Sequence, residues 1–270
     1  MTTFKKLPTI APRIAKKTYG THIIPLFYIA PPSPRAALGL GGAILEAMTT
    51  RTITFSSDAQ YHVYNRGNGK RAIFLNPSDY ARFITLLYIA NTSHQYNIRD
   101  LLKAHADIFD VKRPDQLVEI HAVCLMKNHY HLLVTPLSDD GLSRFMLKLG
   151  TGYSMYFNTK YDRTGSLFEG RFKARHADDD RYLKYLFSYI HLNPVRSHAS
   201  EETFVPARNT FARAKTYPYS SLSIYTNSSP RAALGLGMEK VIKTDLFKMY
   251  FPTEKVLERE LYDWITYEQP

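Results

Sequence analysis

Two histidines separated by one residue, His129 and His131, have the residue type and the spacing of a metal site. They lie in an apolar stretch, Ile120 to Val134, whose composition predicts a β-strand, and alternate side chains of a strand point to the same face. Their Cα atoms would then be roughly 6–7 Å apart. Two neutral imidazoles at that spacing can bind one divalent metal ion. The alternative is a pair of ordinary histidines on a half-buried sheet, and the short pattern alone does not exclude it.

A tyrosine and an asparagine further along the chain, Tyr189 and Asn193, are four residues apart. The acidic residues 178–180 favour the start of a helix before them, because the free N–H groups and the helix dipole attract negative charge. Pro194 predicts the end of that helix directly after Asn193. Residues four apart share a helix face, so the phenol and the amide would point the same way.

These four side chains together predict a site for phosphoryl transfer. A phenol has an unperturbed pKa of about 10, so Tyr189 needs assistance to act as a nucleophile at neutral pH. A metal ion on His129 and His131 would polarise a phosphate, and the amide oxygen of Asn193 would be a third ligand suited to Mg²⁺ or Mn²⁺. The alternatives left open are Tyr182 and Tyr185 as nucleophiles or all three tyrosines as core, and His62, His121 and His191 as ligands.

Four segments of the chain resemble the REP-associated tyrosine transposases. This branch of single-strand DNA transposases carries a His-hydrophobic-His (HUH) motif and one catalytic tyrosine. The segments follow the family's order, and Tyr217 to Ser221 resembles the short tail after the domain; the four are Val63 to Asn68, Met126 to Leu133, Gly165 to Lys173 and Tyr189 to Arg196. The chain departs from the family's common residues at Lys127, Phe168 and His191, and none of these departures removes a proposed site residue.

The resemblance implies an α+β fold of HUH endonuclease type, a ferredoxin-like sandwich whose central antiparallel sheet carries helices on one face. It implies a transposase-like endonuclease and strand transferase that binds single-stranded hairpins of palindromic repeats. Such an enzyme cleaves and rejoins DNA through a covalent phosphotyrosine, here at Tyr189, as a monomer or a homodimer. The alternative is a relative that binds hairpin DNA but no longer cuts it.

The charge of the chain agrees with a nucleic-acid partner. Its formal net charge is +11, which favours a polyanionic ligand, although a merely basic protein is the alternative. Arg171 and Lys173 share one face of a predicted strand beside a family segment, so we expect them to contact phosphates. We expect the same of Arg66 and Arg175.

Other classes of protein fit poorly. The single cysteine, Cys124, excludes an internal disulfide and a cysteine-based zinc site. No apolar run approaches the ~18 residues of a membrane helix, and the short one from His22 to Ala30 follows a basic leader. We therefore expect no membrane partner and a cytoplasmic, nucleoid-associated protein. A nucleotide hydrolase of the histidine-triad type would need a third histidine where Leu133 stands.

The hydrophobic pattern predicts the elements that must position these residues. It predicts a transposase domain over 51–197, a C-terminal tail over 198–270 with short helices and a linker around 226–238, and a poorly structured extension over 1–50. Within the domain we expect strands at 61–64 and 120–134, helices at 78–96, 141–160 and 181–192, a connector at 97–116, and a strand or hairpin at 165–174.

A nine-residue segment, Ser33 to Gly41, recurs without change as Ser229 to Gly237. Its peptide can be encoded by DNA that contains an inverted repeat, so our hypothesis is that both copies are translated palindromes. Met48 is then a candidate start, and residues 1–47 and about 228–237 should be poorly packed and carry no site residue. The alternative is a duplicated linker, and the nucleotide sequence distinguishes the two.

Overall fold

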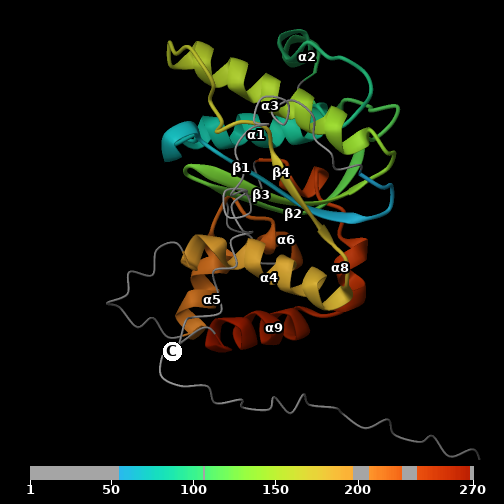
Figure 1. The fold of residues 1–270 in the computed structure, drawn as a ribbon, viewed down its shortest axis with the longest axis vertical. Helices are drawn as coiled ribbons and strands as arrows, with labels where there is room; N and C mark the ends of the chain where they lie inside the picture. The colour runs from blue at the N-terminus through green and yellow to red at the C-terminus, as the bar shows by residue number, and fades with distance from the viewer. Residues whose placement is uncertain (1–54, 106, 197–206, 227–235, 268–270) are drawn as a thin grey trace, which may run out of the picture. The chain divides into compact units, whose positions relative to one another are not determined.

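A four-stranded antiparallel sheet forms the centre of the computed structural model, which describes residues 55–105, 107–196, 207–226 and 236–267 (Figure 1). The strand order is β2-β3-β1-β4. The strands are β1 (Gln60–Arg66), β2 (Val118–Met126), β3 (His129–Pro136) and β4 (Lys173–Ala177). The predictions for residues 1–50, for the Met48 start and for the first copy of the repeat lie outside the described residues.

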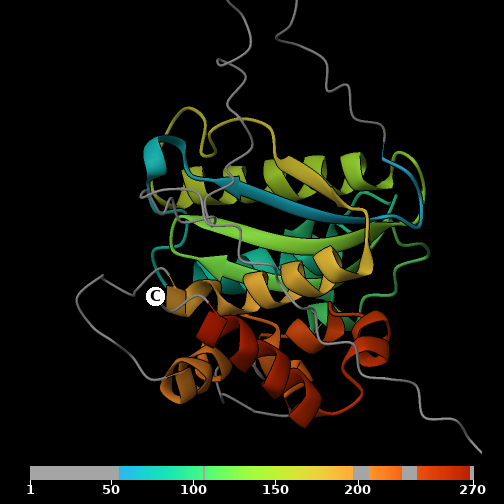
Figure 2. The ribbon, with the colours of Figure 1, turned by 60° about the horizontal axis from the view of Figure 1, so that its bottom comes forward.

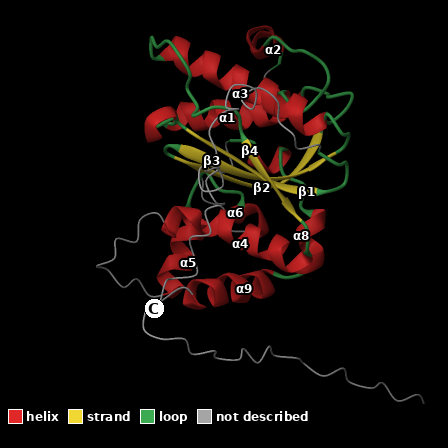
Figure 3. Cartoon of the chain, in the orientation of Figure 1, coloured by secondary structure: helices red, strands yellow, loops and turns green. Residues whose placement is uncertain are grey.

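Helices cover both faces of this sheet (Figure 3). Helices α1 (Pro77–Ile89) and α3 (Gly141–Lys160) pack on one face, and α4 (Asp180–Arg196) packs on the other. Figure 2 shows α4 beneath the sheet, with the tail helices beyond it. The remaining helices are η2 (Asn68–Lys70), α2 (Ile98–Ala104), η3 (Ile108–Asp110), α5 (Ala207–Thr216), α6 (Leu222–Tyr225), η4 (Met238–Lys240), α8 (Asp245–Tyr250) and α9 (Glu254–Tyr267).

The burial of both faces explains the continuous apolar runs of the central strands. Successive side chains of β3 alternate between the two layers: Leu132 and Val134 pack in the cluster with α1 and α3, whereas Leu133 packs in the cluster with α4. Leu132, Leu133 and Val134 are all fully buried. The sheet is therefore the middle of three layers, and its two faces support two separate apolar clusters.

The α+β class and the ferredoxin-like sandwich are confirmed. The order β1-α1-β2-β3-α3-β4 with α1 and α3 on one face is the predicted arrangement. The structure adds the second helical layer, because α4 returns beneath the sheet after β4 (Figure 2). That layer covers the face that carries His129 and His131.

The predicted single strand over 120–134 is wrong, because the chain reverses at Lys127 and Asn128 to form the β2–β3 hairpin. Met126 pairs with His129 across this two-residue turn. Neither residue of the turn has a positive φ, so the turn needs no glycine. The apolar pattern continues on both sides of the turn, so hydrophobicity alone did not indicate it.

The predicted end of the tyrosine helix is also wrong, since α4 continues through Pro194 to Arg196. Proline cannot donate to the carbonyl four residues earlier, but here the cost is confined to the last turn. At the other end, the carboxylate of Asp179 accepts from the Tyr182 N–H at 2.7 Å, as the acidic start predicted.

Two further boundaries differ from the prediction. Helix α1 ends at Ile89 because Asn91 turns to the sheet, where its amide bonds the backbone of Leu117 and Val118. The expected connector after it contains α2 and η3. Strand β4 begins at Lys173, later than the expected 165–174 segment.

The C-terminal tail completes the sheet by covering the edge of β2. Leu125 N–H donates to the Tyr219 carbonyl at 2.9 Å, Ser221 N–H donates to the Val123 carbonyl at 2.9 Å, and Lys243 N–H donates to the Ile120 carbonyl at 2.8 Å. These bonds occupy backbone groups that an edge strand would otherwise expose. The tail is thus an integral part of this fold.

The second copy of the repeat is only partly described. Residues 229–235 lie outside the described part, but Leu236 packs against the core and Gly237 adopts a φ of 70° before η4. A Cβ at Gly237 would lie 2.1 Å from the Phe109 ring, so only glycine fits there. The expectation of poor packing is therefore wrong at the end of this copy.

Substitution of Ser221 tests the tail's role in stability. The Ser221 hydroxyl accepts from Val123 N–H at 3.0 Å and lies 2.9 Å from His191 Nε2, and all three groups are buried. Ser221→Ala leaves both partners unsatisfied and should lower the free energy of unfolding by about 2 kcal/mol. Urea denaturation measures this, with Ser57→Ala on the exposed surface as the control; equal stability of the two variants would contradict the role.

Protonation of His191 should destabilise the fold in acid. Burial lowers the pKa of His191 from 6.5 to about 3, partly opposed by its bond to the Phe187 carbonyl. The unfolded chain therefore binds a proton that the folded chain excludes, and stability falls as the pH drops below 6.5. Between pH 7 and pH 5 the free energy of unfolding should fall by about 2 kcal/mol less in His191→Gln than in the wild type. Urea denaturation in EDTA at both pH values checks this, and an unchanged pH dependence, equal to that of the exposed-site control His176→Gln, would refute it.

Candidate active site

The register of β1 against β3 brings three histidines together on the sheet face that α4 covers. Tyr64 pairs with His131 and Arg66 with His129, while His62 lies one position further along on the same face. The rings of His129 and His131 are 5.0 Å apart, so the predicted sharing of one face is correct. The ring of His62 lies 5.1 Å from that of His131 and nearly parallel to it.

Helix α4 brings the tyrosine and the asparagine to these histidines. The Asn193 amide nitrogen is 3.3 Å from His131 Nε2, and the Tyr189 ring lies 5.6 Å from that of His131. Asn193 and His131 are buried, whereas Tyr189 is only partly buried. The four side chains singled out from the sequence thus meet within one chain.

Each histidine of the pair is held at its Nδ1 atom. His129 Nδ1 lies 2.7 Å from the Asn128 side-chain oxygen, and His131 Nδ1 lies 2.9 Å from His62 Nε2. Asn128 belongs to the β2–β3 turn and His62 to β1, so two different elements fix the two rings. The Nε2 atom of His131 faces the Asn193 amide instead.

The imidazoles are neutral at pH 7. Burial, and then the charge of Arg175, lower the pKa of His62 to about 4. Burial, and then the neighbouring His62 and His129, hold the pKa of His131 well below its usual value. Burial and then Arg66 lower the pKa of His129, against a hydrogen bond with Asn193 that raises it. Neutral imidazole is the form that binds a metal ion.

The residues present fit a divalent ion by their donor types. Two neutral imidazoles lie beside the Asn193 amide, which would present its oxygen after turning about its last bond. In the part of the chain that the structure describes, no cluster of three or more His, Cys, Asp or Glu side chains is placed to hold a metal ion. Three protein ligands at this position would therefore be His129, His131 and the amide oxygen of Asn193.

Of the alternative nucleophiles and ligands, only His62 contacts the histidine pair. The rings of Tyr182, Tyr185 and Tyr189 follow one another along α4 at 6.0 and 5.9 Å, and it is the Tyr189 ring that contacts those of His62 and His131. His121 Nε2 bonds the Thr135 hydroxyl, and His191 bonds Ser221 and the Phe187 carbonyl. Both of these histidines are buried packing residues.

Cations surround the site. The Arg175 guanidinium lies 4.6 Å from the Tyr182 ring centre, and the Lys173 ammonium lies 6.0 Å from that of Tyr64. Arg66 lies at the end of β1 beside the histidines, and Arg171 is exposed just before β4.

The sequence did not indicate two residues that lie beside the site, Tyr64 and Arg196. The Tyr64 ring lies 6.0 Å from that of His131, and the Arg196 guanidinium lies 5.5 Å from the centre of the Tyr189 ring. The sequence indicated His62 only as a possible ligand and not as a partner of His131. Two signals in the sequence could have identified these residues. One is the pairing of β1 with β3, and the other is the three- and four-residue spacing that places Tyr189, Asn193 and Arg196 near one another on α4.

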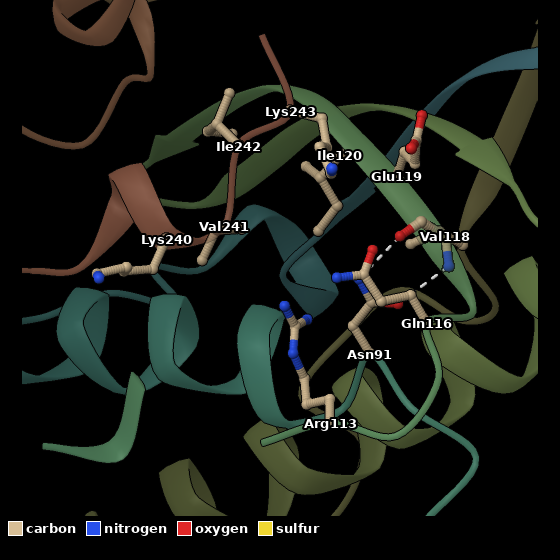
Figure 4. Close-up of a pocket in the computed structure, with 10 residues that line it drawn as sticks. All are labelled: Asn91, Arg113, Gln116, Val118, Glu119, Ile120, Lys240, Val241, Ile242 and Lys243. Carbon is tan, nitrogen blue, oxygen red and sulfur yellow. Dashed lines mark hydrogen bonds between the residues drawn. The ribbon is translucent and has the colours of Figure 1, made fainter. Parts of the chain in front are cut away.

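A pocket lies at the start of β2, at the opposite end of this strand from the histidine site (Figure 4). Arg113, Lys243 and Asn91 are among its polar side chains, and the Asn91 amide bonds the backbone of Val118. Val118 begins β2, whereas the histidine site adjoins the turn at its end, so this pocket is separate from the site.

The sequence of this chain matches a known protein family. The family model described as "Transposase IS200 like" matches residues 56–193, just over half of the chain, from before β1 to Asn193. A solved structure described as "Structure of the REP associates tyrosine transposase bound to a REP hairpin" is similar at 15% identity and a TM-score of 0.41, covering 66% of this chain and 85% of that chain. No curated protein matches.

The described helices include none that is both long and apolar enough to cross a membrane. The family match spans every strand of the sheet and every residue of the histidine, tyrosine and asparagine cluster. This chain belongs to the IS200-like transposase family.

Proposed function

We propose that this DNA-binding transposase is a metal-dependent tyrosine endonuclease and strand transferase. Its substrate would be single-stranded DNA that folds into hairpins at palindromic repeats. The observation that carries the proposal is the placement of Tyr189 and Asn193 against His129 and His131 of the same chain. A purely structural histidine pair, or a tyrosine-rich core helix, would not require a partly exposed phenol to lie against neutral imidazoles.

The Tyr189 hydroxyl would attack a DNA phosphorus. A bond forms between the phenol oxygen and phosphorus while the bond from phosphorus to the departing DNA oxygen breaks. The phenol loses its proton, and the departing oxygen takes one up as a free 3′ hydroxyl. Return attack by a 3′ hydroxyl on the phosphotyrosine restores the phenol and rejoins the strand, so no ATP is required.

The protein's own cations assist this attack. Arg196 lies over the Tyr189 ring, where its positive charge would stabilise the phosphate that the phenol attacks. A bound Mg²⁺ or Mn²⁺, held by His129, His131 and the Asn193 oxygen, would supply Lewis acidity at the phosphate. Buried, neutral imidazoles leave the charge of such an ion undiminished.

The rim of the site would hold the single strand. Lys173 and Arg175 project from β4 on the face that carries the histidines, and Arg66 lies at the end of β1. We propose that these residues and Arg171 contact phosphates, which fix the position of DNA without reading its sequence. The partly exposed rings of Tyr64 and Tyr182 beside them suit base stacking.

One copy of the chain contains every side chain to which we assign a role in this reaction. The contact of Tyr189 with the histidines of its own chain supports cleavage in cis by a monomer, although a homodimer could present the same two sites. As a DNA transposase, the protein would act at the nucleoid in the cytoplasm. Hairpin binding without cleavage is the competing function, and the two experiments below separate them.

Tyr189→Phe should abolish the covalent protein–DNA adduct, because it keeps the ring and removes the attacking oxygen. Hairpin binding should stay within about threefold of the wild type, since the cations are untouched. Denaturing gels with labelled hairpin DNA measure the adduct, and gel shifts measure binding. Tyr185→Phe, one turn away on the same helix, is the matched control. An adduct that persists in Tyr189→Phe and disappears in Tyr185→Phe or Tyr182→Phe would show that the nucleophile is another tyrosine.

Removal of the metal should stop cleavage. EDTA, His129→Ala and His131→Ala should each reduce the rate at least 100-fold, and added Mg²⁺ or Mn²⁺ should restore the EDTA-treated wild type but neither variant. His94→Ala, on the surface, is the control. Cleavage at the full rate in EDTA would disprove the metal role, and hairpin binding without any cleavage would favour the silent relative.

A further inference from the structure

His62 is the buried neighbour of the site to which the proposed chemistry assigns no role. It is 7% exposed, and its Nε2 atom lies 2.9 Å from His131 Nδ1 with the two rings stacked at 22°. The other ring nitrogen of His131, Nε2, lies 3.3 Å from the Asn193 amide nitrogen. Both nitrogens of His131 therefore have partners, and the two partners are of different kinds.

The partners determine which nitrogen of His131 carries the proton. An amide nitrogen only donates, so His131 Nε2 must accept and hold a lone pair. A neutral imidazole then carries its proton on Nδ1, which donates to His62 Nε2. His62 is thus the acceptor of this bond, and its own proton is on Nδ1.

His129 has the same arrangement with a different acceptor. Its Nδ1 atom lies 2.7 Å from the Asn128 side-chain oxygen, which only accepts, so its proton is also on Nδ1. Both histidines of the pair then present a lone pair at Nε2. A metal ion requires this form of a histidine ligand, and the hydrogen bond at the other ring nitrogen usually fixes it.

We propose that His62 is a positioning residue that accepts the Nδ1 proton of His131 and so holds its Nε2 lone pair and ring orientation ready for the metal ion. This inference rests on the metal role in the proposed function. A carboxylate is a common acceptor in such pairs. A neutral imidazole in its place adds no negative charge next to the ion, so the ion's full charge acts on the phosphate of the DNA.

The contact also explains why a histidine suits this position on β1. The ring stacks on His131 and is edge-on to the Tyr189 ring at 6.0 Å, so it fills the space between β1, β3 and α4. A small acceptor such as serine would leave a cavity there. A phenylalanine would fill the space but could not accept the proton.

Two substitutions of His62 separate acceptor from packing. His62→Gln keeps an acceptor near the position of Nε2, whereas His62→Phe keeps a buried ring without one. His121→Phe is the matched control, because His121 is also buried and bonds across the sheet to Thr135, away from the site. Urea denaturation confirms that each variant is folded before it is compared.

Two measurements report on His131 without DNA cleavage. Nitrogen-15 NMR of the metal-free protein gives the tautomer of His131, and titration with Mn²⁺ alone gives its Kd. We expect the Nδ1–H tautomer and a Kd within about threefold of the wild type in His62→Gln and in His121→Phe. His62→Phe should mix the tautomers and weaken Mn²⁺ binding by about 10- to 100-fold.

Three results would contradict the role of His62, and a fourth would contradict the metal role. An Nε2–H tautomer of His131 in the wild type, or an unchanged tautomer and Kd in His62→Phe, would overturn the assignment of His62. Equal weakening in His62→Gln and His62→Phe would also overturn it, because packing alone would then matter. Failure of the wild type to bind Mn²⁺ at all would refute the metal role itself, and the metal-free spectra distinguish that result from an error about His62.

Discussion

The site depends on the packing of α4 against the sheet. Leu183, Leu186, Phe187 and Ile190 form the buried side of this helix and pack in the same cluster as Leu133 of β3. Each residue turns the helix by about 100°, so this buried side fixes the direction of every other side chain. Tyr189 and Asn193 lie next to that side and therefore face the histidines. A shift of one residue in the packing would carry the phenol away from His131.

Burial has a second effect on the same side chains, because it removes the charge of the histidines. Three imidazoles in contact, with Arg66 and Arg175 nearby, would repel one another if protonated. Exclusion of water by α4 keeps them neutral, and the arginines act in the same direction. A basic rim and an uncharged centre are thus compatible: the rim attracts a polyanion, and the centre keeps its nitrogen lone pairs.

Local patterns predicted much of this structure, and long-range pairing accounts for most of what they missed. The bounds of α3 match the expected 141–160, because its amphipathic repeat is uninterrupted. The common face of His129 and His131 followed from strand alternation alone. The contact of His62 with His131 could not be predicted in this way, because it depends on the register of two strands that are distant in sequence. Pro194 and the β2–β3 turn were misjudged because each local rule has exceptions that packing decides.

The covering of β2 by the tail has a consequence for assembly. A sheet with one occupied edge can be extended by another strand only at its other edge, which among the described strands is β4. Two copies of β4 paired antiparallel about their middle would place Arg175 opposite Arg175 of the second copy, and like charges in that position repel. Positive side chains on an edge strand are a common protection against such joining. The positive side chains that we propose to contact phosphates therefore also oppose fusion of two molecules into one continuous sheet.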